Sequence, residues 1–311
     1  MKKINFLSNP EDWQKRLDIT VAKYTNFSRN KIQHAIKKNK VKIEQKIINK
    51  CGFILPAKVV LVEIEMEEEK QFKIIAQKIP LEIIFENQDV IVLNKKMGII
   101  THPSITNDKN TLINALIGHN KKLSNLGLPY RPGVVHRLDK ETSGVIILAK
   151  NDQSHIFLAQ QFAKRKVKKE YLALVHGKLK YQKGTINSPI TRSNIDRKKM
   201  TIAMGNKKGK EAITHFEKIE NFAETTLVKI NLETGRTHQI RVHFASLGHP
   251  LVGDTKYGCL KADKFLEKKL LIKIPSLMLH AEKLEIFLPK EKEKSVFKVP
   301  LQEDFFNFLK S

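Results

Sequence analysis

A nine-residue, mostly polar run between two apolar runs constrains this chain most. The run is His136–Gly144, with the sequence His-Arg-Leu-Asp-Lys-Glu-Thr-Ser-Gly. The turn signal Arg131–Gly133 and the apolar pair Val134–Val135 precede it, and Val145–Ala149, which follows it, predicts a buried strand. A polar loop between two buried strands would hold Asp139 rigidly and face a cleft, although an Asp that merely caps a turn is the alternative.

Two further segments contribute a tyrosine and two arginines. Alternating residues at 170–177 predict a strand that carries Tyr171, which could also be an ordinary half-buried strand tyrosine. Residues 235–241 read Gly-Arg-Thr-His-Gln-Ile-Arg. As a strand, this motif would place Arg236 and Arg241 on opposite faces, where they would serve different partners. His238 and Ile240 would share the face of Arg236, and Thr237 and Gln239 the face of Arg241.

These segments together resemble the RluA/RluD family of pseudouridine synthases, and the resemblance covers essentially the whole chain. It implies that Asp139 is the catalytic residue, and that Arg241 pairs with it. It also implies that Tyr171 stacks on the target base and accepts a proton. The leucine at 279 matches one that packs beneath that base. The substrate-binding candidates are Lys95, His136, Arg137, Arg236 and Leu279.

The family's first motif, a Lys-Pro pair followed by a glycine, resembles Lys95–Gly98 with one departure. Lys96 stands at the proline position, so the loop loses a fixed φ and gains a charge, which would loosen it. Two partners are open to Lys95: a phosphate of the substrate or the active-site loop.

The first part of the chain, from Trp13 to about Glu65, is expected to be a compact unit of two helices and short strands. An amphipathic run begins at Arg16, and Ser28 stands where the N-cap of a second helix should be. Strands are expected at 41–43 and at 59–62.

This order resembles an S4 domain, a small RNA-binding module with a basic helical face. Glu44-Gln45 stands in place of the usual Asn-Gly turn, and Pro56-Ala57 in place of Gly-Asp. A surface helix with solvated lysines is the alternative. The RNA-binding candidates are Ser28, Arg29, Lys31, Lys37 and Lys38.

We therefore predict an α+β protein of two domains. The glutamate-rich stretch at 63–73 reads as a polar linker. The resemblance implies a catalytic domain with a long mixed, mainly antiparallel, bent sheet, flanked by helices and holding a central cleft. The expected parts are an S4-like α/β RNA-binding domain at 1–65, a linker at 66–79 and the pseudouridine synthase domain at 80–311.

The net charge points to RNA. The chain has 57 Lys and Arg against 32 Asp and Glu, which gives +25. Such a field attracts a polyanion, although a lysine bias from an AT-rich genome would also contribute. Residues 185–217 predict two strands joined by a basic hairpin, which could follow an RNA backbone or be a solvated loop. An amphipathic tail with Phe305, Phe306 and Leu309 is expected to cover the core.

Other partners are not expected. Cys51 and Cys259 are too few for a disulfide framework or a zinc cluster, and the histidines at 238, 243 and 249 lack the other ligands of a zinc motif. No apolar run reaches the length of a membrane span, and the start lacks a signal peptide. We expect a cytoplasmic monomer with no metal, no organic cofactor and no membrane partner.

The implied reaction breaks the N1–C1′ bond of uridine, rotates the uracil and rejoins it through C5. Because uracil stays bound, one carboxylate can suffice where a hydrolytic glycosidase uses two. Asp139 would either attack C1′ or remove the C2′ proton, and the sequence leaves both routes open. Arg241 would favour the charged form of Asp139, and Tyr171 would take the C5 proton directly or through water.

The substrate and two other function classes complete the expectations. Pro80–Ile83 after an S4-like domain looks most like the RluD branch, which implies large-subunit (23S) ribosomal RNA; RluC-like and tRNA-directed relatives share the motifs. A non-catalytic ribosome-assembly factor is disfavoured because Asp139, Tyr171 and Arg241 are all present. A serine hydrolase that uses Ser143 with His136 and Asp139 is disfavoured because the chain lacks a G-x-S-x-G elbow there.

Overall fold

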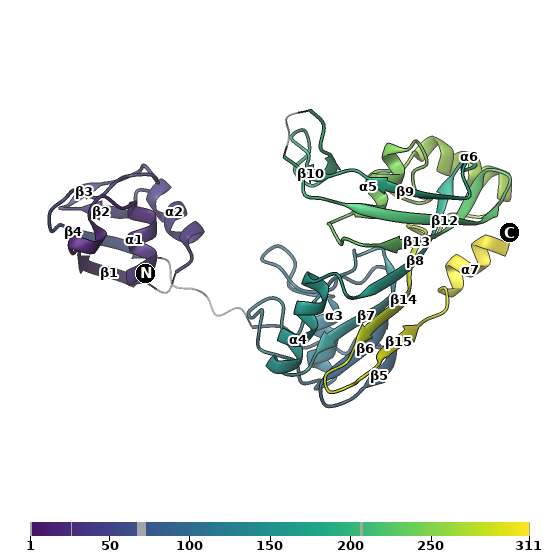
Figure 1. Ribbon diagram of the computed structural model, residues 1–311, viewed down its shortest axis with the longest axis horizontal. Helices are drawn as coiled ribbons and strands as arrows, with labels where there is room; N and C mark the ends of the chain where they lie inside the picture. Colours follow the sequence, from purple (N-terminus) through teal and green to yellow (C-terminus); the bar gives the residue numbers. More distant parts are fainter. Residues whose placement is uncertain (1, 26, 67–72, 206–207, 311) are drawn as a thin grey trace. The chain divides into compact units, whose positions relative to one another are not determined.

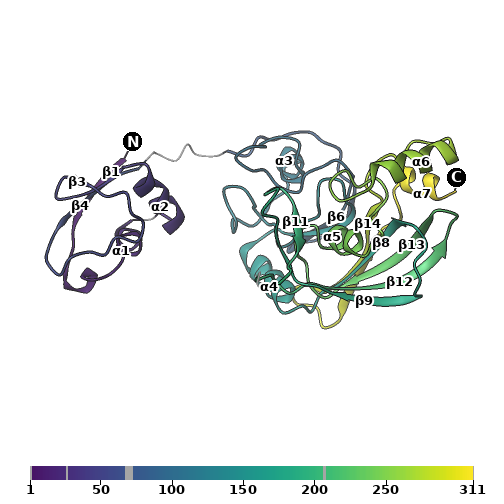
Figure 2. The ribbon, with the colours of Figure 1, turned by 90° about the horizontal axis from the view of Figure 1, so that it is seen from above.

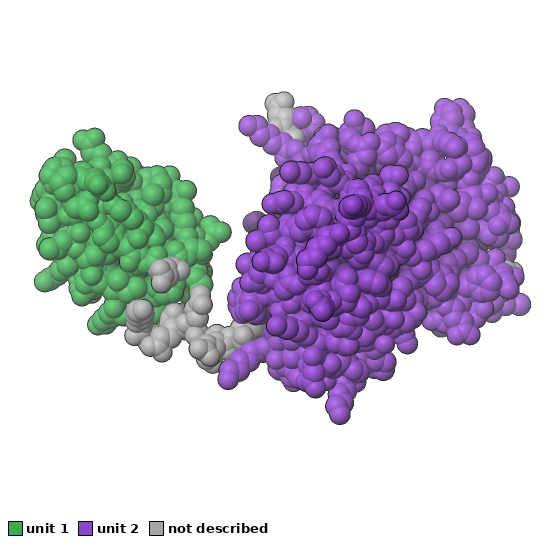
Figure 3. Space-filling view, turned by 60° about the horizontal axis from the view of Figure 1, so that its bottom comes forward, with its two compact units in different colours: residues 1–72 green, residues 73–311 purple. Residues whose placement is uncertain are grey.

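The chain forms two compact units, residues 1–72 and residues 73–311 (Figures 1 and 3). Each unit has a hydrophobic core of its own. The boundary falls within the stretch at 66–79 that we expected to be a linker, of which residues 67–72 lie outside the described part of the chain. The structure, a computed structural model, describes residues 2–25, 27–66, 73–205 and 208–310.

The first unit combines a four-stranded antiparallel sheet with two helices. Leu17 and Val21 of the first helix and Ile32 and Ile36 of the second lie at helical spacing and are fully buried in one core with the strands. In chain order the elements are β1 (Lys2–Leu7), the 3-10 helix η1 (Pro10–Asp12), α1 (Leu17–Tyr24), α2 (Arg29–Lys37), β2 (Val41–Ile43), β3 (Lys46–Ile47) and β4 (Leu61–Met66).

Two strands of this unit differ from the sequence prediction. The strand order is β1-β4-β2-β3, and β1 was not predicted, because Ile4 and Phe6 alone are too short an alternation to detect. β4 starts two residues later than expected and continues through Glu63–Met66, which we had assigned to the linker. Its alternate residues Val62, Ile64 and Met66 are buried, so the glutamates between them mark the outer face of a strand.

The tight turn between β2 and β3 forms without the usual Asn-Gly pair. Glu44 and Gln45 adopt φ values of +46° and +62°, a left-handed conformation that favours glycine or asparagine. The carboxylate of Glu44 accepts a hydrogen bond from the Leu61 amide at 2.7 Å. This bond fastens the turn to β4 and offsets part of the strain.

The second unit is built on a nine-stranded sheet. In chain order its elements are β5 (Ile83–Glu86), β6 (Val90–Lys95), α3 (Leu112–Gly118), β7 (Ser143–Ala149), α4 (Asp152–Ala163), β8 (Lys168–His176), β9 (Lys183–Asn187), β10 (Ile190–Arg192), β11 (Met200–Ile202), β12 (Ile213–Asn221), β13 (Thr225–Leu232), α5 (Gln239–Ser246), α6 (Leu260–Leu270), β14 (Leu279–Phe287), β15 (Lys294–Lys298) and α7 (Glu303–Lys310).

The strand order of this sheet is β5-β6-β7-β14-β8-β13-β12-β9, with β15 also paired to β14. Every pairing is antiparallel except that of β7 with β14. The predicted α+β class with a mixed, mainly antiparallel sheet is thus confirmed. The two strands expected at 185–217 are β9 and β12, and β10 and β11 form a separate hairpin between them.

A glycine lets β7 and β14 run side by side. Gly144 has a φ of +113°, and a Cβ built on it would lie 2.2 Å from the carbonyl oxygen of Ala281 in β14. Only glycine fits so close an approach. The contact sets the end of the His136–Gly144 loop against the start of β14, where Leu279 lies.

The segment before this loop was predicted wrongly. Val134–Val135 is not a strand and contributes only an isolated bridge from Val134 to Leu148. The pairing does not continue, because the neighbouring Ile147 amide donates to the side chain of His136 and not to backbone. Residues 73–79 also differ from a free linker. Ile74 packs on the core of the second unit, and the Asn114 side chain donates to the Ile75 carbonyl at 2.7 Å.

The C-terminal helix closes a smaller apolar cluster, as the tail prediction expected. Phe305 and Phe308 of α7 are buried with Leu266 of α6, and the two helices lie side by side in Figure 2. Phe306 is 45% exposed and does not join them. Within the described ranges, no helix combines the length and apolar character that a membrane crossing requires.

Candidate active site

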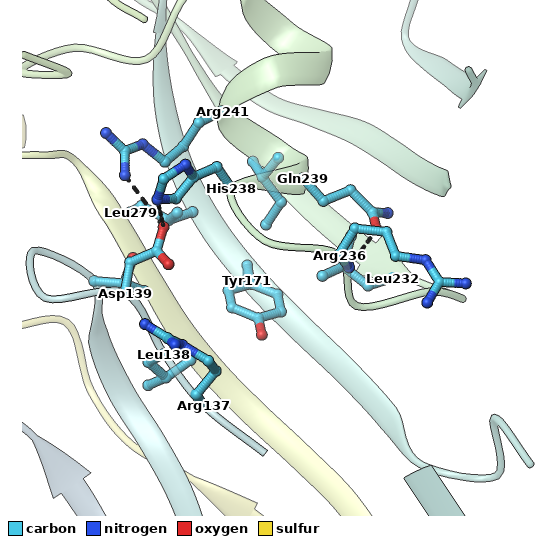
Figure 4. Close-up of a pocket in the computed structure, with 12 residues that line it drawn as sticks. Arg137, Leu138, Asp139, Tyr171, Leu232, Arg236, His238, Gln239, Arg241 and Leu279 are labelled. Atoms are coloured by element: carbon cyan, nitrogen blue, oxygen red, sulfur yellow. Dashed lines mark hydrogen bonds and ion pairs between the residues drawn. The ribbon is translucent and has the colours of Figure 1, made fainter. Parts of the chain in front are cut away.

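Asp139, Tyr171, Arg241 and Leu279 line one hollow that is open to solvent (Figure 4). Asp139 comes from the loop before β7, Tyr171 from β8, Arg241 from α5 and Leu279 from the start of β14. Residues that are far apart in the sequence therefore meet where the loop, two strands and a helix converge. Arg137 and Arg236 also line the hollow.

The backbone on both sides of Asp139 is fastened to the loop after β6. The Thr101 hydroxyl donates to the Leu138 carbonyl at 2.8 Å and accepts from its amide at 3.3 Å. The Gly98 amide and the Lys95 ammonium both donate to the Lys140 carbonyl, at 3.0 and 3.1 Å. Because these bonds hold the residues before and after it, Asp139 keeps a fixed position.

Lys95 supports this loop and does not line the hollow. It is 1% exposed, and Nζ also donates to the carbonyls of Lys96 and Ile99 at 3.0 and 2.8 Å. Burial lowers the pKa of Lys95 to about 7, whereas three carbonyl acceptors match the three N–H bonds of an ammonium. Of the two partners left open for Lys95, the structure supports the active-site loop. The loop that Lys96 was expected to loosen is tied through the carbonyl of Lys96 itself.

Arg241 links Asp139 to a second, deeper carboxylate. Its Nη1 donates to Oδ2 of Asp139 at 3.2 Å, while Nε and Nη2 donate to the two oxygens of Asp254 at 2.8 and 2.7 Å. The Asp254 side chain is fully buried. Burial alone would lower the pKa of Arg241, but Asp254 and Asp139 raise it. Asp254 thus orients a permanently charged guanidinium toward Asp139.

His238 approaches the same oxygen. Its Nε2 lies 3.8 Å from Oδ2 of Asp139, and its Nδ1 lies 2.7 Å from the hydroxyl of Tyr257. That hydroxyl accepts the Met200 amide at 2.8 Å, so its own proton is available to Nδ1 and the proton of a neutral imidazole stands on Nε2. Burial lowers the pKa of His238 more than the Asp139 carboxylate raises it, which favours this neutral form.

The two oxygens of Asp139 therefore differ. Arg241 and His238 both converge on Oδ2 (Figure 4). Within the described ranges, no hydrogen bond engages Oδ1. The carboxylate is anchored by one oxygen and has the other available to a molecule in the hollow.

Tyr171 forms part of the floor of the hollow. It is 9% exposed, and Figure 4 shows it between Asp139 and Arg236. Burial, and then the charge of Asp139, raise the pKa of its phenol above the ordinary value. The hydroxyl thus keeps its proton at neutral pH, and the ring offers a face on which a base can stack.

The motif at 235–241 is not a strand. It forms a turn and then α5, which begins at Gln239 after His238 adopts a left-handed φ of +56°. Ile240 and Phe244 lie four residues apart and are both buried, so the helical period prevails over the alternation that we had assumed. The strand grouping was wrong, because His238 and Arg241 approach the same carboxylate. The two arginines still have different partners, since Arg236 Nε donates to the Glu211 carbonyl at 2.9 Å.

His136 is a structural residue of the loop. Its Nε2 accepts the Ile147 amide at 3.1 Å and its ring stacks on Phe162 at 4.6 Å. Burial lowers the pKa of His136 to about 3, so the ring is neutral. His136 does not line the hollow, so the structure lends no support to the prediction that it binds substrate. Ser143 is buried and lies 2.8 Å from His280, not from His136, so no hydrolase triad is assembled.

The RNA-binding candidates of the first unit are exposed on α2 or at the residues that flank it. Arg29 has a structural contact, because it donates to Asp18 at 2.9 Å, together with Arg16 and Gln33. Burial would raise the pKa of Asp18, but these bonds outweigh it and lower the pKa. The exposed set is Ser28, Arg29, Lys31, Lys37 and Lys38.

Sequence patterns gave no role to His238, Asp254 or Tyr257. The last two stand in the segment after the helix motif, and a buried aspartate three residues before a tyrosine carries no signal of its contacts. Among the described residues, no group of three or more His, Cys, Asp or Glu side chains is arranged to hold a metal ion.

Comparison with known proteins identifies the class to which this fold and hollow belong. Residues 89–246 match the family model of RNA pseudouridylate synthase. The chain is 37% identical over 312 residues to the protein named uncharacterized RNA pseudouridine synthase YlyB of Bacillus subtilis, covering 100% of this chain and 98% of that protein. It is 35% identical over 308 residues to ribosomal large subunit pseudouridine synthase D of Haemophilus influenzae, covering 96% and 92%.

Among solved structures, human RNA pseudouridylate synthase domain containing 1 superposes with a TM-score of 0.58 at 27% identity, covering 71% of this chain and 84% of that one. The chain therefore belongs to the RNA pseudouridylate synthase family. The resemblance to the RluA/RluD family is confirmed, and the protein is an enzyme that isomerises uridine in RNA.

Proposed function

We propose that this enzyme acts on large-subunit ribosomal RNA and that Asp139 is its catalytic residue. The names of relatives such as the Haemophilus influenzae protein support the target. One observation supports the residue above all others. Arg241 donates to Oδ2 of Asp139 and His238 lies beside the same atom, while Oδ1 is available in a hollow open to solvent.

The target uridine enters this hollow out of its stack, which costs about a few kcal/mol for an extruded base. Oδ1 of Asp139 then either attacks C1′ and displaces N1 of the uracil, or removes the C2′ proton so that N1 departs by elimination. In both routes the electron pair of the N1–C1′ bond goes to the uracil, which stays bound. No water has to be activated, so one carboxylate suffices.

Tyr171 and Leu279 hold the detached uracil while it rotates. Both side chains line the hollow and both are buried, so they offer apolar contact on which a base can stack or pack. C5 then bonds to C1′: in the first route it displaces Oδ1 of Asp139, and in the second route Asp139 returns the proton to C2′. The C5 proton leaves last. The raised pKa of Tyr171 argues against the phenolic oxygen as a direct base, so we assign this proton to water and stacking to Tyr171.

Arg241 acts on the reaction through Asp139. Its charge stabilises the carboxylate in the free enzyme, and its bidentate pairing with Asp254 fixes the direction of Nη1. By this account Arg241 is a positioning residue.

RNA is held largely outside the hollow. The net charge of +25 and the exposed lysines of α2, such as Lys37, favour phosphate contacts that release counterions. We assign this role to the first unit, as in an S4 domain. The affinity for RNA is then expected to fall steeply with salt.

The test is to map pseudouridines in the RNA of cells that carry the wild-type gene, no gene, or Asp139→Asn. Specific sites in large-subunit RNA should vanish in the last two strains. Sites that persist with Asp139→Asn would remove Asp139 from the mechanism. Loss confined to transfer RNA would replace the substrate and keep the reaction.

A further inference from the structure

Lys169 is a half-buried lysine beside the hollow for which the described residues offer no hydrogen bond or ion pair. It lies on β8 two residues before Tyr171, so both side chains are on the same face of the sheet. Its neighbour Lys168 points to the other face and pairs with Glu285 at 3.2 Å. The two adjacent lysines thus have different surroundings.

Two arginines accompany Lys169. Its Nζ lies beside Gly235, where a built Cβ would be 3.6 Å away, and Gly235 precedes Arg236. Arg236 donates through Nε to the Glu211 carbonyl, and the Glu211 carboxylate pairs with Arg165. One residue, Glu211, therefore ties both arginines to the place where Lys169 stands.

This cluster has more positive charge than the protein neutralises. The carboxylate of Glu211 forms an ion pair with Arg165. Glu233 also raises the pKa of Arg165 through its charge, but its carboxylate is bonded to His215 at 2.7 Å. Across the described ranges, no ion pair joins Lys169 or Arg236 to a carboxylate, and the nearby Glu211 is already paired with Arg165. Burial, and then the charges of Arg165 and Arg236, lower the pKa of Lys169 to about 8. Gathering cations in a partly enclosed place is unfavourable unless an anion binds there.

The position of the cluster indicates which anion. Arg236 lines the hollow on the opposite side of Tyr171 from Asp139 (Figure 4). A nucleotide whose base stacks on Tyr171 would thus have its sugar at Asp139. The adjacent nucleotide of the RNA strand would then lie near Arg236. Planar guanidinium groups and an ammonium suit phosphate oxygens.

We infer that Lys169, Arg236 and Arg165 bind one backbone phosphodiester of the RNA strand, next to the target uridine. This inference rests on the proposed function, since it takes the hollow to hold a uridine. The phosphate supplies the charge that Lys169 lacks and sets the strand relative to Asp139.

The first test measures the dissociation constant for a transcript that the wild-type enzyme modifies, at several salt concentrations. Lys169→Met should weaken binding about tenfold and reduce the salt slope by about one, as expected for one lost phosphate contact. Lys169→Arg should restore both. The matched control Lys168→Met, on the other face of β8, should bind as the wild type does.

The second test places one neutral methylphosphonate at each linkage around the target uridine in turn. At one linkage the wild type should lose about tenfold in affinity and Lys169→Met should lose nothing further. Equal losses for both proteins at every linkage would overturn the inference. So would equal binding by Lys169→Met and Lys168→Met.

The outcomes separate the site from the function. If the wild type forms pseudouridine but neither test singles out Lys169, only the phosphate site fails. If the wild type forms no pseudouridine in any RNA, the proposed function fails first. Should Lys169→Met not fold, Lys169→Arg and the wild type with neutral linkages still decide, since a single sensitive linkage is required.

Discussion

At the scale of single residues, the two oxygens of the Asp139 carboxylate have different surroundings. Oδ2 of Asp139 receives Arg241 at 3.2 Å and has His238 at 3.8 Å. Catalysis is then a matter of holding one atom still and leaving the other available. Asp254 orients Arg241, and Tyr257 orients His238. Both should therefore affect the reaction rate nearly as much as Arg241 and His238 do.

Tyr257→Phe tests this statement. Loss of the hydroxyl removes the bond that sets the proton of His238 on Nε2, so the rate at saturating RNA should fall about tenfold, or ~1.4 kcal/mol. The Michaelis constant and the melting temperature should change little. In a His238→Gln background the same change should have no further effect. Phenylalanine at the exposed Tyr181 is the control, and equal rates for the two single variants would contradict the role.

Lys169 gives a pH dependence. Its pKa is lowered to about 8 in the free protein, and a bound phosphate favours the charged form. Binding thus takes up a proton above pH 8, and the affinity for RNA should fall as pH rises from 8 to 9.5. Arginine guanidinium groups in general stay charged in this pH range, and His136 stays neutral. Titration of affinity should show the fall in the wild type and not in Lys169→Arg; the same fall in both would contradict it.

At the scale of elements, the loop that carries Asp139 is stabilised by hydrogen bonds from the end of β6 and from the loop that follows it, more than by bonds within itself. Lys95 and Thr101 supply the bonds on either side of Asp139. The exposed Lys96 at the motif's proline position does not change this arrangement.

Lys95→Met should therefore be costly. The carbonyls of Lys96 and Ile99 lose the ammonium as their donor, and the carbonyl of Lys140 keeps only the Gly98 amide. This predicts a loss of about 2–4 kcal/mol in the free energy of unfolding. Lys96→Met, one residue away and exposed, should stay within about 0.5 kcal/mol. Urea denaturation of the two variants compares them, and equal stabilities would show that Lys95 does not hold the loop.

The elements also show what the sequence could predict. The apolar run Val145–Ala149 was correctly predicted as a strand, because a short run of apolar residues by itself indicates a strand buried on both faces. The motif at 235–241 was assigned the wrong element, since a turn at His238 resets the period just before the helix. Asp254 and Tyr257 could not be predicted as parts of the site, because their contacts arise only when α5 packs beside the segment that follows it.

Lys95 and His136 show that a residue of a recognised motif can have a structural role. Both belong to segments that resemble family motifs, and both were predicted to bind substrate. Their bonds run to the backbone instead. A motif indicates that a residue belongs to a site. Its contacts in the folded chain decide whether it faces the ligand or supports the backbone.

At the scale of the whole molecule, the chain separates the unit that holds the candidate active site from a smaller unit to which we assign RNA binding. The α+β class and the approximate boundary followed from motif order and composition, whereas β1 and residues 73–79 depend on contacts across the chain. The cytoplasmic location and the monomeric state stay predictions.

Residues 73–311 should fold without the first unit, because their core is their own. The fragment should still form pseudouridine at saturating RNA but bind more weakly, with a shallower dependence of affinity on salt, since the phosphate contacts of α2 are lost. Calorimetric melting and filter binding compare it with the full chain. An unfolded fragment, or one with unchanged affinity and salt slope, would contradict this division of roles.

The most direct measurement of the central claim uses RNA labelled with tritium at C5 of uridine. Formation of the new C5–C1′ bond must release that tritium to water, so release counts turnovers. We predict release by the wild type and none above background by Asp139→Asn, with both proteins binding the RNA equally. Release by Asp139→Asn at a rate near that of the wild type would contradict a reaction that depends on this one carboxylate.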